Sequence, residues 1–218
     1  MKIHININIK VGRVVKYFVL SDLFFTAGWG FVEPVFSVFI IERVIGATLL
    51  TVGITAAIYW ILKSIIEIPV ANYLDRARGE KNAFIVLVGG LFLASLSAFA
   101  FSLVREVWEL YAVQVLHAIV FALYLPSWTA IFSRHLDKER ISFDWSLDSA
   151  VAGIAAGLTG LLSGIVAEEF GFTVVFVMAG VLSMIAAFIL AVSPDIILPK
   201  PTHSEEIMKE HTPSEIGI

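Results

Sequence analysis

Six long apolar runs, separated by short polar connections, account for most of this chain. The runs extend from Tyr17 to Ile41, Thr51 to Leu74, Ala83 to Val104, Leu110 to Phe132, Ser142 to Val166 and Thr173 to Val192. Each is close to the ~20 residues that an α-helix needs to cross the hydrocarbon core of a bilayer. The pattern predicts an all-α membrane protein whose six transmembrane helices lie within residues 17–192.

Composition excludes a water-soluble protein. Hydrophobic residues make up 58% of the chain and charged residues only 16%, whereas soluble domains are about half apolar and about one quarter charged. Such a chain cannot cover a water-facing surface, so we expect membrane lipid to surround it. Cysteine is absent, so disulfides and thiolate metal sites are excluded.

The basic residues predict the orientation of the helices. Only Arg43 and Arg105 fall in connections on one side of the predicted membrane. Twelve basic residues fall on the other side: Lys2, Lys10, Arg13, Lys16, Arg76, Arg78, Lys81, Arg134, Lys138, Arg140, Lys200 and Lys209. Because Lys and Arg are enriched in cytoplasmic loops, we expect both termini, residues 1–16 and the polar tail 193–218, to be cytoplasmic. A plasma or inner membrane location is the simplest expectation.

A charged turn joins the second and third runs. The second run ends in Asp75 and Arg76, Gly79 follows, and Lys81 precedes the third run. This turn resembles the signature between the second and third helices of major facilitator superfamily transporters. That signature reads Gly, three residues, Asp-Arg/Lys, one residue, then Gly and two basic residues. Ala71 replaces the first glycine, and Gly79 comes one residue late. The resemblance implies that Asp75, Arg76, Gly79 and Lys81 form a gating motif.

The two halves of the chain show weak internal similarity. A shift of 92 positions, without gaps, aligns Pro34 with Pro126, Ser37 with Thr129, Asp22 with Gln114, Gly79 with Gly171, Phe84 with Phe176 and Ala94 with Ala186. Three helices repeated once give two units of opposite orientation, because three is an odd number. This inverted 3+3 repeat is the arrangement expected within half of a major facilitator fold.

The resemblance extends over nearly the whole chain, and it implies a function. The family ordinarily has twelve helices and this chain has six, so either two copies form one transporter or the sequence is truncated. We expect a secondary active transporter of a small molecule or ion, working by alternating access as a homodimer of six-helix halves. The intramembrane acids suggest proton coupling. A non-transporting scaffold or accessory subunit is the alternative, and a membrane-embedded enzyme is disfavoured because no nucleophile–base pair is present.

Ionisable residues within predicted spans are costly and commonly face a cavity or a partner. Asp22 is a candidate proton-binding or cation-binding carboxylate, or else an acid near the interface that is hydrated or bonded to a neighbouring helix. Glu33 precedes Pro34, which interrupts helical hydrogen bonding. This carboxylate either lines a gate or binds substrate, or else it sits at a hydrated rim. His117 could relay protons or form a structural hydrogen bond between helices.

Two pairs of ionisable residues are spaced four apart and therefore share a helix face. Lys63 and Glu67 form either a static ion pair or one that opens when protonated or when an anionic substrate arrives. Asp144 lies in a predicted first turn, where we favour a capping role. Asp148 lies one turn deeper, and we expect it to be a coupling carboxylate.

Other features give no further chemistry. No spacing of His or carboxylates indicates a metal, and no glycine loop indicates a nucleotide, so neither cofactor nor nucleic acid is expected. The fifth run carries glycines every three or four residues, a spacing that lets helices pack closely. These are Gly153, Gly157, Gly160 and Gly164. Trp29, Trp60 and Trp128 are candidates to line a cavity.

Overall fold

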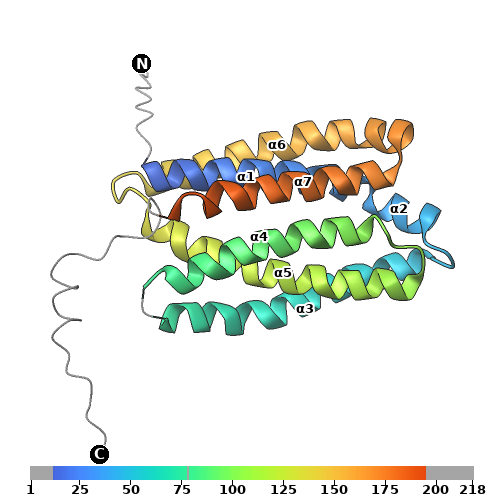
Figure 1. Ribbon diagram of the computed structural model, residues 1–218, viewed down its shortest axis with the longest axis horizontal. Coiled ribbons are helices and arrows are strands. Elements are labelled where there is room, and N and C mark those ends of the chain that lie inside the picture. The colour runs from blue at the N-terminus through green and yellow to red at the C-terminus, as the bar shows by residue number, and fades with distance from the viewer. Residues whose placement is uncertain (1–11, 78, 195–218) are drawn as a thin grey trace, which may run out of the picture.

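The structure, a computed structural model, describes residues 12–77 and 79–194 (Figure 1). Within these ranges it consists of helices joined by short connections, with one isolated β-bridge between Ile45 and Glu106. The elements are α1 (Arg13–Val32), the 3₁₀ helix η1 (Glu33–Val35), α2 (Phe36–Arg43), α3 (Leu49–Arg76), α4 (Lys81–Phe101), α5 (Val107–Arg134), α6 (Ile141–Phe170) and α7 (Phe172–Ala191). Among the described residues, six helical segments are long and apolar enough to cross a membrane. The predicted fold class is confirmed: an all-α membrane protein with six spans. Residues 1–11 and 195–218 contain most of the two predicted terminal segments and lie outside the described residues.

The first span is not one continuous helix. It is divided into α1, η1 and α2 at Glu33 and Pro34, because proline has no N–H group to continue the hydrogen-bond ladder. The fifth span is longer than its apolar run and continues beyond Val166 to Phe170. Gly171 then ends it with a left-handed φ of +84°, a conformation that favours glycine.

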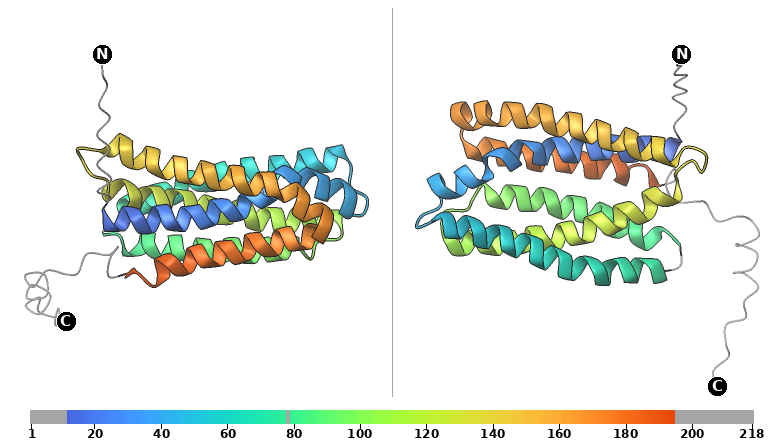
Figure 2. Two further views of the ribbon diagram at one scale, coloured as in Figure 1. Left: turned by 90° about the horizontal axis from the view of Figure 1, so that it is seen from above. Right: turned by 180° about the vertical axis from the view of Figure 1, so that it is seen from behind.

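The helices form two layers of three (Figures 1 and 2). In one layer α1 packs against α6 and α7, and in the other α5 packs against α3 and α4. Contacts between α4 and α7 join the two layers. The first helix of each sequence repeat, α1 or α5, therefore packs mainly against the later helices of the other repeat.

The helix boundaries follow the predicted repeat spacing. Helix α3 begins at Leu49 and α6 begins at Ile141, 92 positions later. The turns that end these helices carry the aligned pair Gly79 and Gly171, and both glycines have a φ of +84°. Helices α1 and α5 run in opposite directions along the bundle (Figure 1), which is the relation that an inverted repeat predicts.

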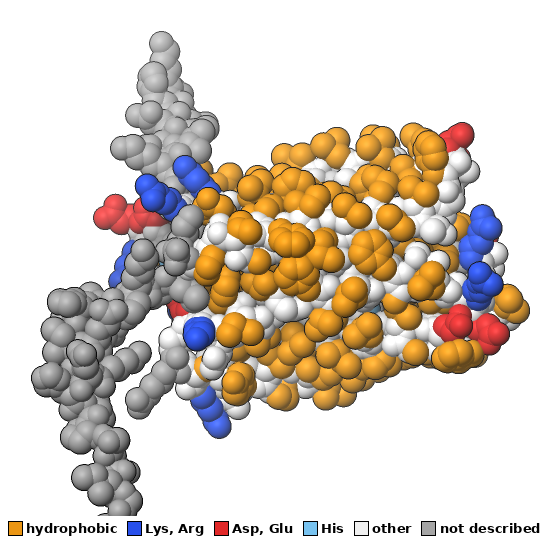
Figure 3. All heavy atoms as spheres, viewed as in Figure 1, with side chains coloured by type: hydrophobic (Ala, Val, Ile, Leu, Met, Phe, Trp, Pro, Cys, Tyr) orange, Lys and Arg blue, Asp and Glu red, His pale blue; other side chains and the backbone are white. Residues whose placement is uncertain are grey.

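The surface is divided into an apolar middle and two charged ends (Figure 3). Hydrophobic side chains cover the visible flank of the bundle, while Lys, Arg, Asp and Glu gather at its ends. Helices α3 and α6 are much less covered than the others. Only 11% of the residues in the most apolar window of each are buried, against 44–56% in the other four spans. These two helices present the faces of the bundle that lack neighbours within the described part of the chain.

Small residues bring α1 close to its neighbours. Gly28 lies against Ala179 of α7, and Gly30 lies against Ala156 and Thr159 of α6. A Cβ atom added at Gly160 would lie 3.5 Å from Cγ of Pro34 and 3.7 Å from the carbonyl oxygen of Gly30, which are ordinary contact distances, so this glycine lies beside the break in the first span but is not required there by close packing. At the other three glycines of α6, an added Cβ atom would have nothing within 4 Å, so contacts with the described residues do not explain their small size.

Candidate functional site

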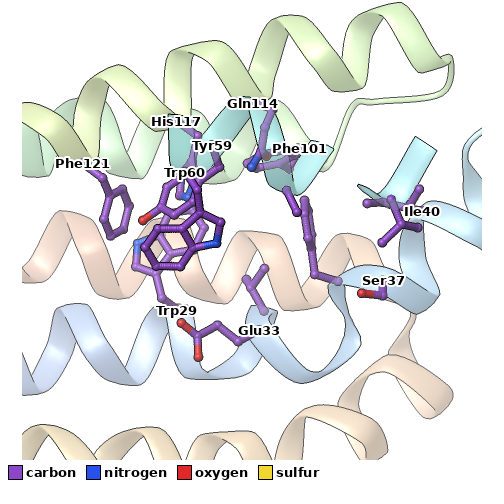
Figure 4. A pocket seen from close by; sticks show the side chains of 14 residues that line it. Trp29, Glu33, Ser37, Ile40, Tyr59, Trp60, Phe101, Gln114, His117 and Phe121 are labelled. Atoms are coloured by element: carbon purple, nitrogen blue, oxygen red, sulfur yellow. The ribbon is translucent and has the colours of Figure 1, made fainter. Parts of the chain in front are cut away.

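A cavity of about 310 Å³ lies between the end of α1, helix α3 and helix α5 (Figure 4). Its walls are Trp29, Val32, Glu33, Phe36, Ser37, Ile40, Val52, Ala56, Tyr59, Trp60, Phe101, Gln114, His117 and Phe121. The cavity therefore brings together Glu33 and His117, two predicted site residues from different helices. Two of the three tryptophans predicted to line a cavity also do so, whereas Trp128 packs in the core against Phe132.

The helix break at Pro34 positions Glu33. Its side chain is exposed and lines the cavity at the point where α1 gives way to η1. His117 is buried, and its ring centroid lies 4.3 Å from that of Trp29 and 5.1 Å from that of Tyr59. The Nδ1 atom of His117 lies 3.4 Å from the Ser97 hydroxyl. The ring of His117 is therefore part of the aromatic wall of the cavity, and Ser97 is its hydrogen-bonding partner.

Asp22, Asp148 and Tyr124 form a second cluster, built from α1, α6 and α5. The Tyr124 hydroxyl donates a hydrogen bond to Oδ1 of Asp22 over 2.8 Å, and the Thr26 hydroxyl lies 3.4 Å from the other carboxylate oxygen. Asp148 is 7% exposed and interacts electrostatically with Asp22 and Tyr124. Within the described part of the chain, Oδ1 of Asp148 has no hydrogen-bond partner. Uptake of a proton by either carboxyl removes the repulsion between them.

Tyr124 was not among the residues that the sequence singled out. It lies in the middle of an apolar run with two other aromatic residues nearby, and its periodicity does not distinguish it from a core residue. The signal that identifies it is its three-dimensional relation to Asp22, which is 102 positions earlier in the chain.

Lys63 and Glu67 form an ion pair on α3, with Nζ and Oε2 2.9 Å apart. Their side chains are 12% and 29% exposed. The Lys63 Nζ also lies 5.7 Å from the ring centroid of Trp60, a residue of the first cavity. Glu67 lines a second cavity of about 530 Å³ together with Asp75 and Arg134. The ion pair therefore lies between the two cavities.

The residues of the predicted gating motif lie around the turn from α3 to α4. Asp75 and Arg76 are exposed at the end of α3, Gly79 adopts the left-handed conformation, and Lys81 is the first residue of α4. Arg78 lies outside the described residues. The turn also carries Glu80, whose Oε2 lies 3.6 Å from Nε2 of His135 at the end of α5, a contact that the sequence did not predict.

Asp144 lies in the first turn of α6, as expected, but its carboxylate does not cap that helix. Its Oδ2 accepts a hydrogen bond from the backbone N–H of Asp137 over 3.0 Å, and Asp144 is 3% exposed. The residue ties the α5–α6 loop to the start of α6. No group of three or more His, Asp or Glu side chains in residues 12–77 and 79–194 could hold a metal ion.

Comparisons with known proteins show what this chain is similar to. The family model described as Major Facilitator Superfamily matches residues 18–216. An uncharacterized MFS-type transporter of Methanocaldococcus jannaschii is 24% identical over 206 residues, which is 93% of this chain and 52% of that protein. A proton-coupled antiporter flippase, LtaA, of Staphylococcus saprophyticus is 24% identical over 83 residues, 38% of this chain and 21% of that protein.

A solved structure has the same fold. The crystal structure of the POT family transporter PepTSo aligns with a TM-score of 0.73 over 88% of this chain and 40% of that one, at 13% sequence identity. The chain spans about half the length of the Methanocaldococcus relative and smaller parts of the other two proteins. The family model covers most of the sequence and the six-helix fold agrees with it, so this chain belongs to the Major Facilitator Superfamily.

Proposed function

We propose that this chain forms one half of a secondary active transporter, which moves a small solute by alternating access. The observation that carries the proposal is the position of the two cavities, which lie one after the other along α3 and α5 with the Lys63–Glu67 pair between them. One six-helix unit lines the solute path on a single side. A second wall is needed to enclose the solute. The uncovered faces of α3 and α6 are where a second six-helix unit would supply it.

A second copy of the chain is the simplest source of that wall. Two-fold association is the commonest symmetry of soluble oligomers, and it uses the same surface patch on both partners. Rocking of the two halves would then open first one cavity and then the other to its side of the membrane. The twelve basic residues on one side support cytoplasmic termini and a plasma or inner membrane location.

Protons are the proposed coupling ion, and Asp22 and Asp148 are their proposed binding site. Buried carboxylates on facing helices can take up a proton from one side and release it to the other as the helices move. Tyr124 supports this role because its hydroxyl binds one of the two carboxylates directly. A static scaffold has no need of two interacting acids at this depth.

Uptake into proteoliposomes under an imposed pH gradient, screened over a small panel of solutes, tests the proposal. We expect one or more solutes to accumulate, and we expect Asp22→Asn and Asp148→Asn to abolish the dependence on the gradient without loss of stability. The amide keeps the shape of the carboxyl but cannot release a proton. Asp137→Asn, in an exposed loop, is the matched control.

The outcomes separate the alternatives. Full gradient-driven uptake by both Asn variants would remove these acids from the coupling role. A well-folded protein that moves no solute in the presence or absence of a gradient would favour the scaffold or accessory subunit.

A further inference from the structure

The cavity between α1, α3 and α5 has an aromatic wall with a carboxylate at its edge. Trp29, Tyr59, Trp60 and Phe121 contribute rings, and Glu33 contributes the acid (Figure 4). Aromatic faces carry partial negative charge and attract cations, tryptophan most strongly. Among the described residues that line this cavity there is no Lys or Arg. The fixed charge at its edge is therefore negative.

The nearby Lys63 does not change this balance. It lies beside Trp60, but its ammonium group is 2.9 Å from the Glu67 carboxylate, which neutralises it. No ion pair or hydrogen bond ties the carboxylate of Glu33 to another residue in the described ranges. The contact between Lys63 and Trp60 also indicates that this indole ring accepts a cation in its present orientation.

Two buried polar atoms at the cavity wall have no partner within residues 12–77 and 79–194. They are the indole N–H donor of Trp29 and the amide oxygen of Gln114. Buried polar groups are normally paired, and leaving one unpaired costs about 1–3 kcal/mol. Both atoms are closed off from the cavity in this conformation, so the aromatic rings and the Glu33 carboxylate are the groups that a ligand would meet.

We propose that this cavity binds a small organic cation of the ammonium class. Its charged end lies against Trp60 and Glu33, which both line the cavity. The volume of about 310 Å³ is at the lower end of the ~300–1,000 Å³ range of small-molecule pockets, which limits the ligand to a compact one. The inference rests on the proposed transport function only in taking this cavity as the substrate site.

Equilibrium binding to the protein in lipid nanodiscs tests the proposal without requiring transport. The probes are choline and its neutral carbon analogue, dimethylbutanol, which have nearly the same shape and differ in charge. Calorimetric titration should show choline binding at least about tenfold more tightly, because the cation–π and carboxylate contacts act only on the charged probe.

Two pairs of variants locate the site. Glu33→Gln should weaken choline binding about tenfold by removing the carboxylate at the cavity edge, whereas Glu42→Gln makes the same change outside the cavity and should have no effect. Trp60→Leu should weaken binding, and Trp108→Leu should not. These two tryptophans are similarly exposed, at 62% and 66%, and all four variants alter exposed side chains, so each should fold.

The results distinguish this inference from the proposed function. Equal affinity for the charged and neutral probes would overturn the inference, as would unchanged choline affinity in Glu33→Gln. Transport of a neutral or anionic solute without choline binding would leave the transporter proposal standing and remove the cation site. Choline binding without any solute movement would support the cation site and count against the transporter proposal.

Discussion

Replacing Gly30 with Ala tests how closely α1 must approach α6 for this fold to be stable. A Cβ atom at this position would lie 2.9 Å from the Ala156 Cα and 3.2 Å from its carbonyl oxygen, and it would also clash with the Thr159 hydroxyl. Rotation of Thr159 can relieve the last contact. The contact with the Ala156 backbone can be relieved only if the two helices move apart.

The size of the effect follows from this geometry. Ordinary Cβ contacts begin at 3.4 Å, so the helices must separate by about 0.5 Å at this point. Overpacking of this kind costs about 1–3 kcal/mol, and the higher helix propensity of Ala returns about 0.5–1 kcal/mol. We expect a net loss of about 0.5–2 kcal/mol in the free energy of unfolding, which lowers Tm by about 1–8 °C in a chain of this length.

Gly89→Ala, within α4, is the matched control. Its added Cβ would meet nothing within 4 Å, so only helix propensity changes and Tm should rise by about 1–4 °C. Thermal unfolding of both variants in one detergent or nanodisc preparation measures the difference. A Gly30→Ala protein at least as stable as the wild type, or equal losses in both variants, would refute the close-packing argument.

Three further experiments address the proposed roles. Lys63→Ala should destabilise the protein more than the double change with Glu67→Ala, because a single change leaves a partly buried charge without its partner. Additive losses in thermal unfolding would mean that the two residues do not interact. Tyr124→Phe removes the hydroxyl that binds the α1 carboxylate, so gradient-driven uptake should shift its pH dependence, and an unchanged pH profile would exclude a role in proton binding. If two copies associate, Asp75→Cys and Ser142→Cys should cross-link between copies, because a carboxylate favours the N-terminal end of a facing helix and both positions are exposed. A chain that remains monomeric in bilayers, with only intramolecular cross-links, would contradict the homodimer.

The membrane fold was predictable from the sequence because it depends on local properties. Run length indicated six spans, and the bilayer thickness that sets helix length is known in advance. Lys63 and Glu67 were paired correctly because four positions on a helix always share a face. The glycine at position 79 was identified from the motif, and its left-handed conformation is the physical reason that a glycine occurs there.

The candidate sites depend on which helices are neighbours, and the sequence does not specify that. Asp22 and Asp148 were selected separately, as single acids within apolar runs, and nothing in their spacing placed them in one cluster. Tyr124 was missed for the same reason. Asp144 was expected to cap its own helix. Instead, the α5–α6 loop folds back, and the backbone N–H of Asp137 donates a hydrogen bond to the Asp144 carboxylate. Loop conformation, unlike span length, is set by such tertiary contacts.

Helix α1 packs against α6 and α7, the last two helices of the chain, and this has a consequence for biosynthesis. The hydroxyl of Ser21 in α1 donates to the carbonyl of Ala186 in α7, a residue 165 positions later in the chain. At ~5–20 residues per second of translation, roughly 8–33 s separate the synthesis of these two residues. During that interval α1 and its Asp22 have been made, but the later helices that partly cover this residue have not. The nascent chain must hold its first span in a transient environment, in lipid or beside the insertion machinery, until the last two spans arrive.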